Sequence, residues 1–445
     1  MTNTTLTLIS KSPGPSARGE AWALCVALDC DDLAATPVRL SLAGVDEVEI
    51  GRGDARAFRR TGSKLRIDVS NPGASQVHAR LCADGDAWVI ADAGSKNGTY
   101  VGTAKVDRAA LAEGDVLECG GSCFVLRRAP ITGREIDEPD PRLGALRTLS
   151  PALQRELSIV PKLARSKLAI LVGGESGTGK DVAAQTIHEL SGRRGSIVAV
   201  NCGAIPPTLI ESELFGSKRG AFSGAEDRLG LVRAADGGTL FLDEVAELPA
   251  PAQAALLRLL QNGEVMAVGA SKVMTVDVRI VAATHQRLDK LSEGGRFRRD
   301  LYARLRGHEL RLPRLASRIE DLGLLIAALL VRIEPHGPRR RLARAAARAL
   351  FAHPWPFHIR ELEQTLRGAV AIAEGSQLAE EDLRLSVPDE AWGPEPERDV
   401  LIAELRRHDG NLSAVARELA TSRSQVRRLL ERHALTVDMF RRSKT

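Results

Sequence analysis

The sequence predicts a multidomain chain: an all-β domain first, then an α/β domain with a helical lid, then an all-α domain. Three observations predict this order. Short apolar stretches between turn residues fill positions 1–128, buried-strand patterns alternate with helical patterns from about residue 145, and the last residues form short amphipathic helices. A length of 445 residues also suits two to four domains.

The composition narrows the class of protein. Hydrophobic residues make up 44% and charged residues 27%, which excludes a mostly disordered chain. No apolar run reaches the roughly 18 residues of a membrane helix, and the first residues lack the pattern of a signal peptide, so we expect a cytoplasmic protein. The six cysteines contain no Cys-x-x-Cys pair and are expected to be buried, reduced thiols. A net charge of +5 permits an anionic partner without identifying one.

Residues 1–128 are predicted to form a β-sandwich, because short strands recur roughly every ten residues between turn signals. The predicted strands are Glu47–Ile50, Leu65–Val69, His78–Cys82, Ala87–Ile90 and Val116–Leu117. Proline, glycine and acidic residues in 129–144 then predict a linker.

Residues 145–387 are predicted to form an α/β domain with a mostly parallel sheet. Its apolar runs are typical of strands buried on both faces, and helical stretches such as Pro251–Asn262 lie between them. The predicted strands are Leu168–Val172, Ile197–Val200, Leu240–Leu242 and Val278–Ala282. A helical, arginine-rich lid is expected from about residue 319, and 388–397 is predicted to be a second linker.

A phosphate-binding loop is predicted between a strand and a helix of this domain. The residues that fit Gly-x4-Gly-Lys are Gly174, Glu175, Ser176, Gly177, Thr178, Gly179 and Lys180. Glycines allow backbone N–H groups to turn inward around phosphates, and Lys180 can reach the β- and γ-phosphates. Asp181 replaces the usual hydroxyl residue, so Mg²⁺ needs another ligand.

That ligand is expected at the end of a later strand. Asp243 and Glu244 directly follow the apolar run Leu240–Leu242. Asp243 is predicted to hold Mg²⁺, while Glu244 orients and polarises the attacking water. The two motifs together predict a site for a nucleoside triphosphate and Mg²⁺.

The central domain resembles the bacterial enhancer-binding proteins, the AAA+ ATPases that activate sigma-54 RNA polymerase, over about residues 145–385. The acidic Asp181 fits the family's phosphate loop, and Glu213–Gly216 matches its Glu-Leu-Phe-Gly motif. The resemblance implies a sigma-54 contact loop made of Gly220, Ala221, Phe222, Ser223, Gly224 and Ala225. An apolar Phe222 at an exposed tip needs a partner, and the alternative is a surface turn with the ring folded inward.

The resemblance assigns roles to four more residues. Asn201 matches the asparagine that holds the water-polarising glutamate. Arg298 and Arg304 match arginines offered to the γ-phosphate of a neighbouring subunit, which implies a homo-oligomeric, hexameric ring. Arg360 matches the sensor arginine of the lid. The alternative for each arginine is a solvated surface charge or a structural ion pair.

Five positions depart from the family pattern, and one of them, Ser223, replaces the threonine of the contact loop. Phe357 and His358 replace a usual Gly-Asn pair in the lid, and Ser217 and His285 replace residues that are more often histidine and asparagine. These changes leave the predicted phosphate chemistry intact and put the nucleotide-dependent motion of the lid in question.

The first domain resembles forkhead-associated (FHA) modules, which bind phosphothreonine peptides. The resemblance rests on a Gly-Arg pair ending at Arg52, a Ser-x-x-His motif from Ser75 and an Asn-Gly-Thr motif from Asn97. It implies that Arg52 and Ser75 contact the phosphate and that Asn97 holds the peptide backbone, while His78 and Gly98 support the loops. The alternative is a β-sandwich that binds no ligand.

Residues 398–436 are predicted to form a helix-turn-helix that resembles the Fis-type DNA-binding module. Asp399–His408 is the first predicted helix, Asn411 begins the second, and Thr421 and Ser422 cap the third. The predicted DNA-binding residues are Ser422, Arg423, Gln425, Arg427 and Arg428. The alternative is a basic helical bundle that serves assembly. A further arginine-rich stretch, Arg339–Arg348, is predicted to be a solvated helix face of the lid.

Together these features predict an ATP-dependent transcriptional activator. Its expected partners are an upstream DNA site, sigma-54 RNA polymerase, a phosphothreonine protein and further copies of the chain. One alternative is a DNA-binding regulator whose ATPase module only controls oligomerisation and no longer engages sigma-54. Another is a phosphopeptide adaptor that acts mainly as a binding module.

Overall fold

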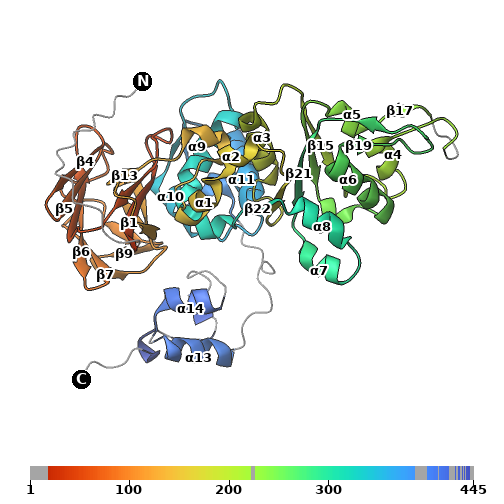
Figure 1. The fold of residues 1–445 in the computed structure, drawn as a ribbon. Helices are drawn as coiled ribbons and strands as arrows, with labels where there is room; N and C mark the ends of the chain where they lie inside the picture. Colours follow the sequence, from red (N-terminus) through yellow and green to blue (C-terminus); the bar gives the residue numbers. More distant parts are fainter. Residues whose placement is uncertain are drawn as a thin grey trace. The chain divides into compact units, whose positions relative to one another are not determined.

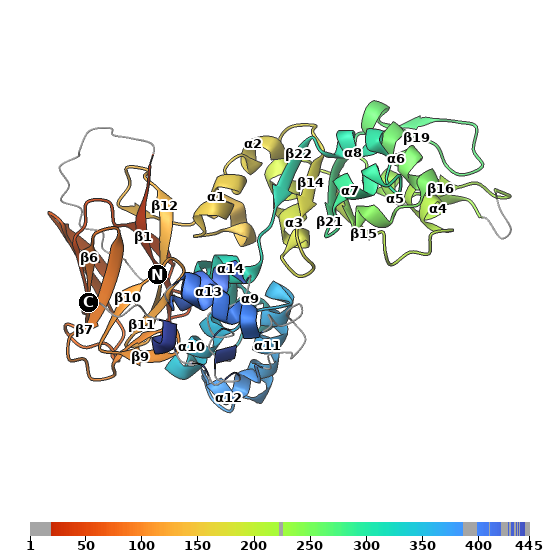
Figure 2. The same ribbon diagram turned by 90° about the horizontal axis from the view of Figure 1, so that it is seen from below.

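The computed structural model describes residues 19–221, 226–385, 398–408 and 410–419, together with residues 426, 429, 430, 433, 435 and 437–440. The chain divides into two compact units (Figures 1 and 2). The first contains Met1–Ile136, Leu329–Pro356 and Glu363–Thr445, and the second contains Asp137–Ala328 and Phe357–Leu362. Among the described residues, no helix has the length and apolar character needed to span a bilayer.

The first unit begins with a β-sandwich, drawn in red to orange in Figure 1. Its two sheets have the strand orders β13-β2-β1-β12-β11-β8-β9 and β10-β7-β6-β3-β5-β4. The strands are β1 (Glu20–Asp29), β2 (Val38–Ser41), β3 (Glu47–Arg52), β4 (Ala57–Thr61), β5 (Lys64–Val69), β6 (Ala79–Asp84), β7 (Ala87–Asp92), β8 (Thr99–Val101), β9 (Ala104–Val106), β10 (Arg108–Leu111), β11 (Val116–Cys119), β12 (Ser122–Pro130) and β13 (Ile136–Asp137). One apolar core joins the inner faces of both sheets.

The all-β prediction for this region is confirmed, with one difference at its end. Each of the five predicted strands coincides with an observed one, while the long antiparallel pair β1–β12 was not predicted. The segment expected as a linker adds strand β13 to the seven-stranded sheet, and the Ser41 backbone N–H donates to the Glu135 carbonyl at 2.9 Å. Acidic residues and prolines therefore mark the edge of the sandwich here rather than a free connection.

The first unit also contains most of the lid. Its elements are α9 (Leu322–Ile333), which starts in the second unit, β23 (Arg341–Leu342), α10 (Arg344–Ala352), α11 (His358–Ile372), β24 (Gln377–Leu378) and α12 (Glu380–Leu383). Trp355 is fully buried, and its indole Nε1 donates to the Leu350 carbonyl at 3.0 Å. The His353 ring packs edge-on against it with centroids 4.6 Å apart. This aromatic pair fixes the chain after α10.

The last helices of the first unit fit the predicted all-α domain. They are α13 (Arg398–Arg407), α14 (Leu412–Glu418) and the 3-10 helix η4 (Val437–Phe440). Their shared core consists of Leu401, Leu405, Leu412, Val415, Ala416, Val426, Leu429 and Leu430. The first two predicted helices are thus observed, and most of the predicted third helix lies outside the described residues.

The second unit is an α/β domain with a parallel sheet, as predicted. The strand order is β15-β18-β21-β14-β22, and Figure 2 shows β21, β14 and β22 side by side. The strands are β14 (Ile170–Gly173), β15 (Ile197–Asn201), β18 (Thr239–Asp243), β21 (Arg279–Thr284) and β22 (His308–Arg311). Short pairs form between β16 (Gly216–Ser217) and β17 (Arg228–Leu229), and between β19 (Glu264–Val265) and β20 (Met274–Thr275).

Helices cover both faces of this sheet. On one face η1 (Pro141–Leu146), α1 (Pro151–Leu157), α2 (Val160–Ala164) and α3 (Lys180–Ser191) share a core with Phe241 and Val281. The other face carries α4 (Ile210–Phe215), α5 (Leu231–Ala234), α6 (Ala250–Asn262), α7 (Leu288–Glu293) and α8 (Arg299–Leu305). The 3-10 helices η2 (Val245–Glu247) and η3 (Leu315–Asp321) complete the unit. Alternation along β18 sends Leu240 and Leu242 to the second core and Phe241 to the first.

The parallel strands bring the predicted catalytic residues to one edge of the sheet. Strand β14 ends at the phosphate loop, β18 ends at Asp243, and β21 ends beside His285. Asn201 at the end of β15 is in register with Asp243. Because carboxyl ends of parallel strands meet at one edge, this edge is where the fold places a ligand site.

Candidate functional site

The phosphate loop has the backbone geometry that its glycines predict. Gly177 and Gly179 have φ of 85° and 98°, values in the left-handed region that favours glycine. Helix α3 begins directly afterwards at Lys180. The Lys180 side chain is buried, and its Nζ donates to the carbonyls of Gly174 and Glu175 at 3.0 and 3.2 Å. The ammonium group therefore lies at the loop that the motif assigns to phosphates.

Residues 357–362 lie against the phosphate loop. The Ile359 N–H donates to the Gly177 carbonyl at 2.9 Å, and a Cβ on Gly177 would lie only 2.4 Å from the Phe357 carbonyl oxygen. Arg360 Nη1 donates to Ser176 Oγ at 2.9 Å. The predicted sensor arginine thus contacts the loop that is predicted to bind the nucleotide phosphates.

Glu175 connects the loop to two cationic or potentially cationic side chains. Arg314 Nε lies 2.5 Å from Glu175 Oε1, and His358 Nε2 lies 3.0 Å from Oε2. Burial alone would raise the pKa of Glu175, but hydrogen bonds from Arg314 and His358 outweigh it and lower this pKa. Glu175 therefore stays ionised and holds the loop to its surroundings.

Asp243 and Glu244 form a concentration of negative charge beside Lys180. Lys180 Nζ lies 3.7 Å from Glu244 Oε1. Burial and the neighbouring Glu244 and Asp181 charges raise the pKa of Asp243, while Lys180 lowers it. A bound cation would relieve this excess negative charge, so Asp243 fits the predicted Mg²⁺ ligand. In the described parts of the chain, no group of three or more His, Cys, Asp or Glu residues could hold a metal.

Among the described contacts, the shortest to the Glu244 carboxylate comes from the His285 side chain. His285 Nδ1 lies 2.7 Å from Glu244 Oε2, and Thr284 Oγ1 lies 3.5 Å from the same oxygen. Asn201, predicted to hold this glutamate, instead accepts a hydrogen bond from the Gly203 N–H at 3.0 Å. From the sequence, His285 was identified only as a departure from the family's usual asparagine. Its position shortly after the predicted strand Val278–Ala282 could have indicated that it lies at the same edge of the sheet as Glu244.

Arg298 and Arg304 lie at the two ends of α8. Arg298 Nη2 is 2.7 Å from Asp300 Oδ2, and its backbone N–H donates to Gln253 Oε1 at 2.9 Å. Both arginines are exposed. Their positions are compatible with contact to another subunit, and their catalytic role stays a prediction.

The predicted sigma-54 contact loop is described only at its base. Gly220 and Ala221 are described, whereas Phe222, Ser223, Gly224 and Ala225 lie outside the described residues. The β16–β17 pair closes the base, where the buried Ser217 hydroxyl donates to the Glu226 carbonyl at 2.7 Å. The predicted DNA-binding residues Ser422, Arg423, Gln425, Arg427 and Arg428 also lie outside the described residues.

Hydrogen bonds join the three motif loops of the sandwich. The Arg52 N–H donates to the Ser75 carbonyl at 2.8 Å, and the Lys96 N–H donates to Ser75 Oγ at 3.0 Å. The buried His78 ring accepts from the Ser75 N–H through Nδ1, and its Nε2 lies 3.1 Å from the Gly98 carbonyl. The Arg52 side chain is exposed. These contacts place Arg52, Ser75 and the loop before Gly98 together at one end of the sandwich.

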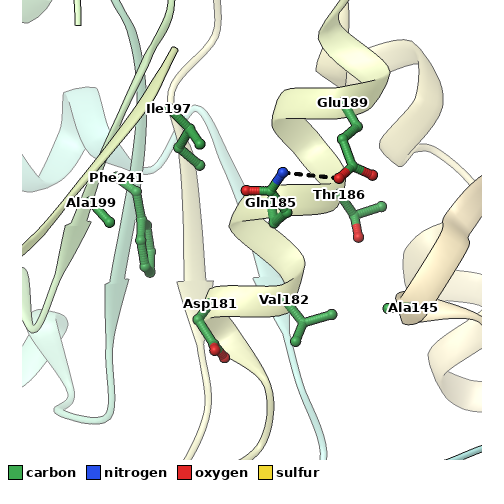
Figure 3. A pocket seen from close by; sticks show the side chains of 9 residues that line it. All are labelled: Ala145, Asp181, Val182, Gln185, Thr186, Glu189, Ile197, Ala199 and Phe241. Carbon is green, nitrogen blue, oxygen red and sulfur yellow. Dashed lines mark hydrogen bonds between the residues drawn. The ribbon is translucent and has the colours of Figure 1, made fainter. Parts of the chain in front are cut away.

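A cavity of about 370 Å³ lies beside α3 (Figure 3). Figure 3 shows Asp181 at the start of α3, with Phe241 and Ile197 opposite the helix and Gln185 bonded to Glu189. The lining residues are Ala145, Asp181, Val182, Gln185, Thr186, Glu189, Ile197, Ala199 and Phe241. The cavity therefore follows the flank of α3 and reaches Asp181, the residue directly after Lys180.

Comparison with protein families matches four consecutive regions. Residues 48–120 match the FHA domain, 146–311 the sigma-54 interaction domain, 316–398 the AAA+ ATPase lid domain, and 394–433 the bacterial regulatory protein model of the Fis family. The fold and the phosphate loop thus define an AAA+ module that stands between an FHA domain and a Fis-family helix-turn-helix domain.

Several curated proteins are similar to this chain. The transcriptional regulatory protein GlrR of Escherichia coli K12 is 39% identical over 310 residues, which cover 67% of this chain and 70% of GlrR. The acetoin catabolism regulatory protein of Cupriavidus necator is 40% identical over 336 residues, covering 69% of this chain and 49% of that protein. HoxA of Bradyrhizobium diazoefficiens, a hydrogenase transcriptional regulatory protein, is 41% identical, with 60% of each chain covered. The chain therefore belongs to the family of sigma-54-dependent transcriptional regulators.

The chain spans about half the length of the acetoin regulator and 60% of HoxA. A crystal structure of NtrX from Brucella abortus in complex with ATP aligns with a TM-score of 0.49 at 32% identity, covering 66% of this chain and 70% of NtrX.

Proposed function

We propose that this protein is an ATP-dependent transcriptional activator that binds upstream DNA and remodels sigma-54 RNA polymerase. The observation that carries the proposal is the grouping of Lys180, Asp243 and Glu244 at one edge of a parallel sheet, in a chain of the sigma-54-dependent family. The FHA domain regulates the activator by reading a phosphothreonine. The acting form is a homo-oligomeric ring, a hexamer by resemblance to the family.

The geometry supports a separate role for each of these residues in ATP hydrolysis. Lys180 exchanges its bonds to the loop carbonyls for bonds to the triphosphate. Asp243 would hold Mg²⁺, which would neutralise phosphate charge when bound. Glu244 orients the attacking water and accepts its proton. His285, which contacts this glutamate, positions it, and Asn201, which the family resemblance assigns to this role, is the alternative. Arg298 and Arg304 reach the γ-phosphate bound by a neighbouring subunit, which makes turnover depend on assembly.

Three further groups of residues complete the proposal. Arg360 links the state of the bound nucleotide to the lid through its contact with Ser176. The predicted contact loop, residues 220–225, pushes Phe222 against sigma-54. The predicted DNA-binding residues, from Ser422 to Arg428, read the DNA major groove. Arg52 and Ser75 bind the phosphate of a phosphothreonine whose peptide backbone Asn97 holds.

The hydrolysis site is tested with two substitutions and a surface control. Lys180→Ala should abolish ATP binding and turnover, while Glu244→Gln should retain ATP binding and lose turnover by about 100-fold or more. Lys290→Ala, which changes an exposed lysine on α7, should behave like the unmodified protein. Normal turnover in Glu244→Gln would refute the assignment of the site.

The activator function is tested by open-complex formation with purified sigma-54 RNA polymerase. We expect a requirement for ATP and its loss in Phe222→Ala with ATP hydrolysis retained. Equal open-complex formation by Phe222→Ala, or none by the unmodified protein, would favour the alternative in which the ATPase module only controls oligomerisation.

A further inference from the structure

The sandwich and the lid, both in the first unit, contact each other directly. The Leu342 backbone N–H on β23 donates to the Cys30 carbonyl, just after β1, at 2.9 Å. Next to this bond, Arg341 Nη1 lies 3.9 Å from Asp31 Oδ1. A main-chain hydrogen bond requires close approach of the two backbones, so the contact is specific in position.

A buried ion pair forms the centre of this contact. Glu118 is 2% exposed, and its Oε2 accepts from Arg348 Nη1 on α10 at 2.7 Å, while its Oε1 accepts from the Gly121 N–H. The Arg348 guanidinium also stacks 4.2 Å from the centre of the Tyr100 ring. A buried carboxylate is costly without its cation, so removing the lid would leave Glu118 unpaired. At Arg348, the sequence-based expectation of a solvated helix face is therefore wrong.

The loop that contacts the lid also belongs to the predicted phosphothreonine site. A Cβ on Gly73 would lie 3.2 Å from Arg344 Cζ on α10 and 2.6 Å from the Gly120 carbonyl oxygen. The Gly73 carbonyl accepts a hydrogen bond from Asn97 Nδ2 at 2.6 Å. Ser75, the predicted phosphate ligand, follows in the same loop. One short loop thus contacts α10, Asn97 and the site for the phosphate.

We propose that this end of the sandwich (residues 29–31, 71–75 and 118–121, termed the lid-facing end) is a docking surface for β23 and α10 of the ATPase lid, and that phosphothreonine binding is coupled to this docking. The coupling rests on the phosphothreonine reading proposed above, whereas the docking does not. Coupling between two binding events is reciprocal, so a ligand at Arg52 and Ser75 changes docking as much as docking changes its affinity.

Helix α10 precedes the segment of the lid that contacts the phosphate loop, so docking of the sandwich on α10 can affect ATP turnover. Helix α10 is followed in the sequence by residues 357–362, which contact the phosphate loop through Ile359 and Arg360. A sandwich held on α10 restrains the part of the lid from which this segment emerges. Phosphothreonine binding therefore regulates ATP turnover through the lid.

Docking is tested in the full chain by cross-linking across the contact. Asp31→Cys and Arg341→Cys, in a Cys82→Ser background, should be joined efficiently by a short bis-maleimide, because their native side chains lie within 4 Å. Asp31→Cys combined with Arg367→Cys is the control, because the partner of Arg367 is Glu363 of the lid and not a residue of the sandwich. Equal cross-linking of both pairs, or none in the first pair, would overturn the proposal.

The ion pair is tested with two arginine-to-methionine variants. Arg348→Met should reduce cross-linking at least fivefold, whereas Arg332→Met, which removes a lid arginine bonded to Glu363, should leave it unchanged. A similar reduction in both variants would show that the loss reflects general damage to the lid and would contradict the role of Arg348.

The coupling is tested with O-phosphothreonine as the probe and threonine as the control. Millimolar phosphothreonine should change the cross-linking rate at least threefold in the unmodified site and not in Arg52→Ala. Binding of phosphothreonine without a change in rate would overturn the coupling. If calorimetry shows no binding of phosphothreonine while cross-linking persists, the phosphothreonine reading fails and the docking surface stands.

Discussion

His285 holds the carboxylate on which the proposed hydrolysis depends. A water-polarising glutamate must point at the water in a fixed orientation, because a misplaced base loses most of its effect. Glu244 is oriented by His285 Nδ1 at 2.7 Å from Oε2, while Lys180 lies 3.7 Å from its other oxygen. Asn201 contacts the Gly203 backbone instead. At this site the structure and the family resemblance assign the positioning role to different residues.

We predict that His285→Ala lowers kcat for ATP hydrolysis about tenfold or more, with KM for ATP changed less than about twofold, because the contact orients Glu244 and does not bind phosphate. His285→Asn should restore much of the rate, since its amide can donate to the same oxygen. Steady-state kinetics of the assembled protein measure both effects. Full activity of His285→Ala with a large loss in Asn201→Ala would assign the role to Asn201.

The contrast between Lys180 and His285 shows what a sequence can predict at a site. Lys180 and Asp243 belong to local patterns, a glycine loop before a helix and an acidic strand end, so their positions follow from neighbouring residues. The His285–Glu244 contact depends on β21 pairing with β18, a long-range arrangement that no local pattern encodes. The same holds for Arg348, whose partner Glu118 lies in another domain.

At the scale of elements, the phosphate loop is constrained by its backbone and by what packs on it. Gly177 combines a positive φ with a carbonyl oxygen 2.4 Å from the site of a Cβ. Gly192, which ends α3, has a φ of 69° and nothing within 4 Å of that site. Both glycines have a positive φ, but only Gly177 has other atoms close to the position of a Cβ.

We therefore predict that Gly177→Ala abolishes ATP binding, because its methyl group would displace residues 357–362 from the loop. Gly192→Ala is the matched control and should lower the free energy of unfolding by only about 1 kcal/mol, the cost of a left-handed alanine, with ATP binding retained. Calorimetric titration with ATP and chemical denaturation provide the two measurements. Equal ATP affinity in both variants would contradict the tight packing at Gly177.

The elements that the sequence predicted well are those with a clear hydrophobic period. The five predicted strands of the sandwich and the four of the parallel sheet are present, because alternating or continuous burial leaves a direct pattern in the residues. Strand β1 was missed although residues 22–28 are almost wholly apolar, since a short apolar run does not distinguish strand from helix. Strand β13 was missed because it consists of only two residues in a proline-rich segment, which is too short to show a hydrophobic period.

At the scale of the whole molecule, each of the two units contains at least one buried cysteine, so thiol reactivity can be followed in each unit separately. Cys25, Cys30, Cys119 and Cys123 are buried in the first unit, Cys202 is buried in the second, and Cys82 is exposed. The expectation of buried thiols thus holds for five of the six. Burial raises the pKa of Cys202 to about 12, and it also raises the pKa of Cys119. A hydrogen bond with Cys30, together with burial, raises the pKa of Cys123.

These differences predict the thiol reactivity of the native protein. Only the thiolate attacks a disulfide reagent, and a thiol with a pKa near 12 is ionised at about one part in 10⁴ at pH 8. We expect Cys82 alone to react quickly at pH 8, no fast reaction in Cys82→Ser, and six reactive thiols in guanidinium. Since raising the pH increases the thiolate fraction, the slow reaction of Cys202 should accelerate as the pH rises above 8. Several fast thiols in the native protein would contradict the closed cores described here.

Labelling of the cysteine thiols during unfolding in urea measures the stability of each unit separately, with and without a ligand. If the units open separately in urea, Cys202 and the four buried sandwich cysteines become reactive at different concentrations. ATP binds the folded second unit in our proposal, so saturating ATP should raise the midpoint for Cys202 in proportion to the logarithm of its concentration. Mass spectrometry of labelled peptides assigns each midpoint. ATP binding is checked separately by comparison with Lys180→Ala, which should not bind ATP. If the unmodified protein binds ATP and the urea midpoint for Cys202 does not move, the placement of the nucleotide in the second unit is contradicted.

The Arg348–Glu118 ion pair lies in the first unit, so Arg348→Met should lower the urea midpoint of the sandwich cysteines instead.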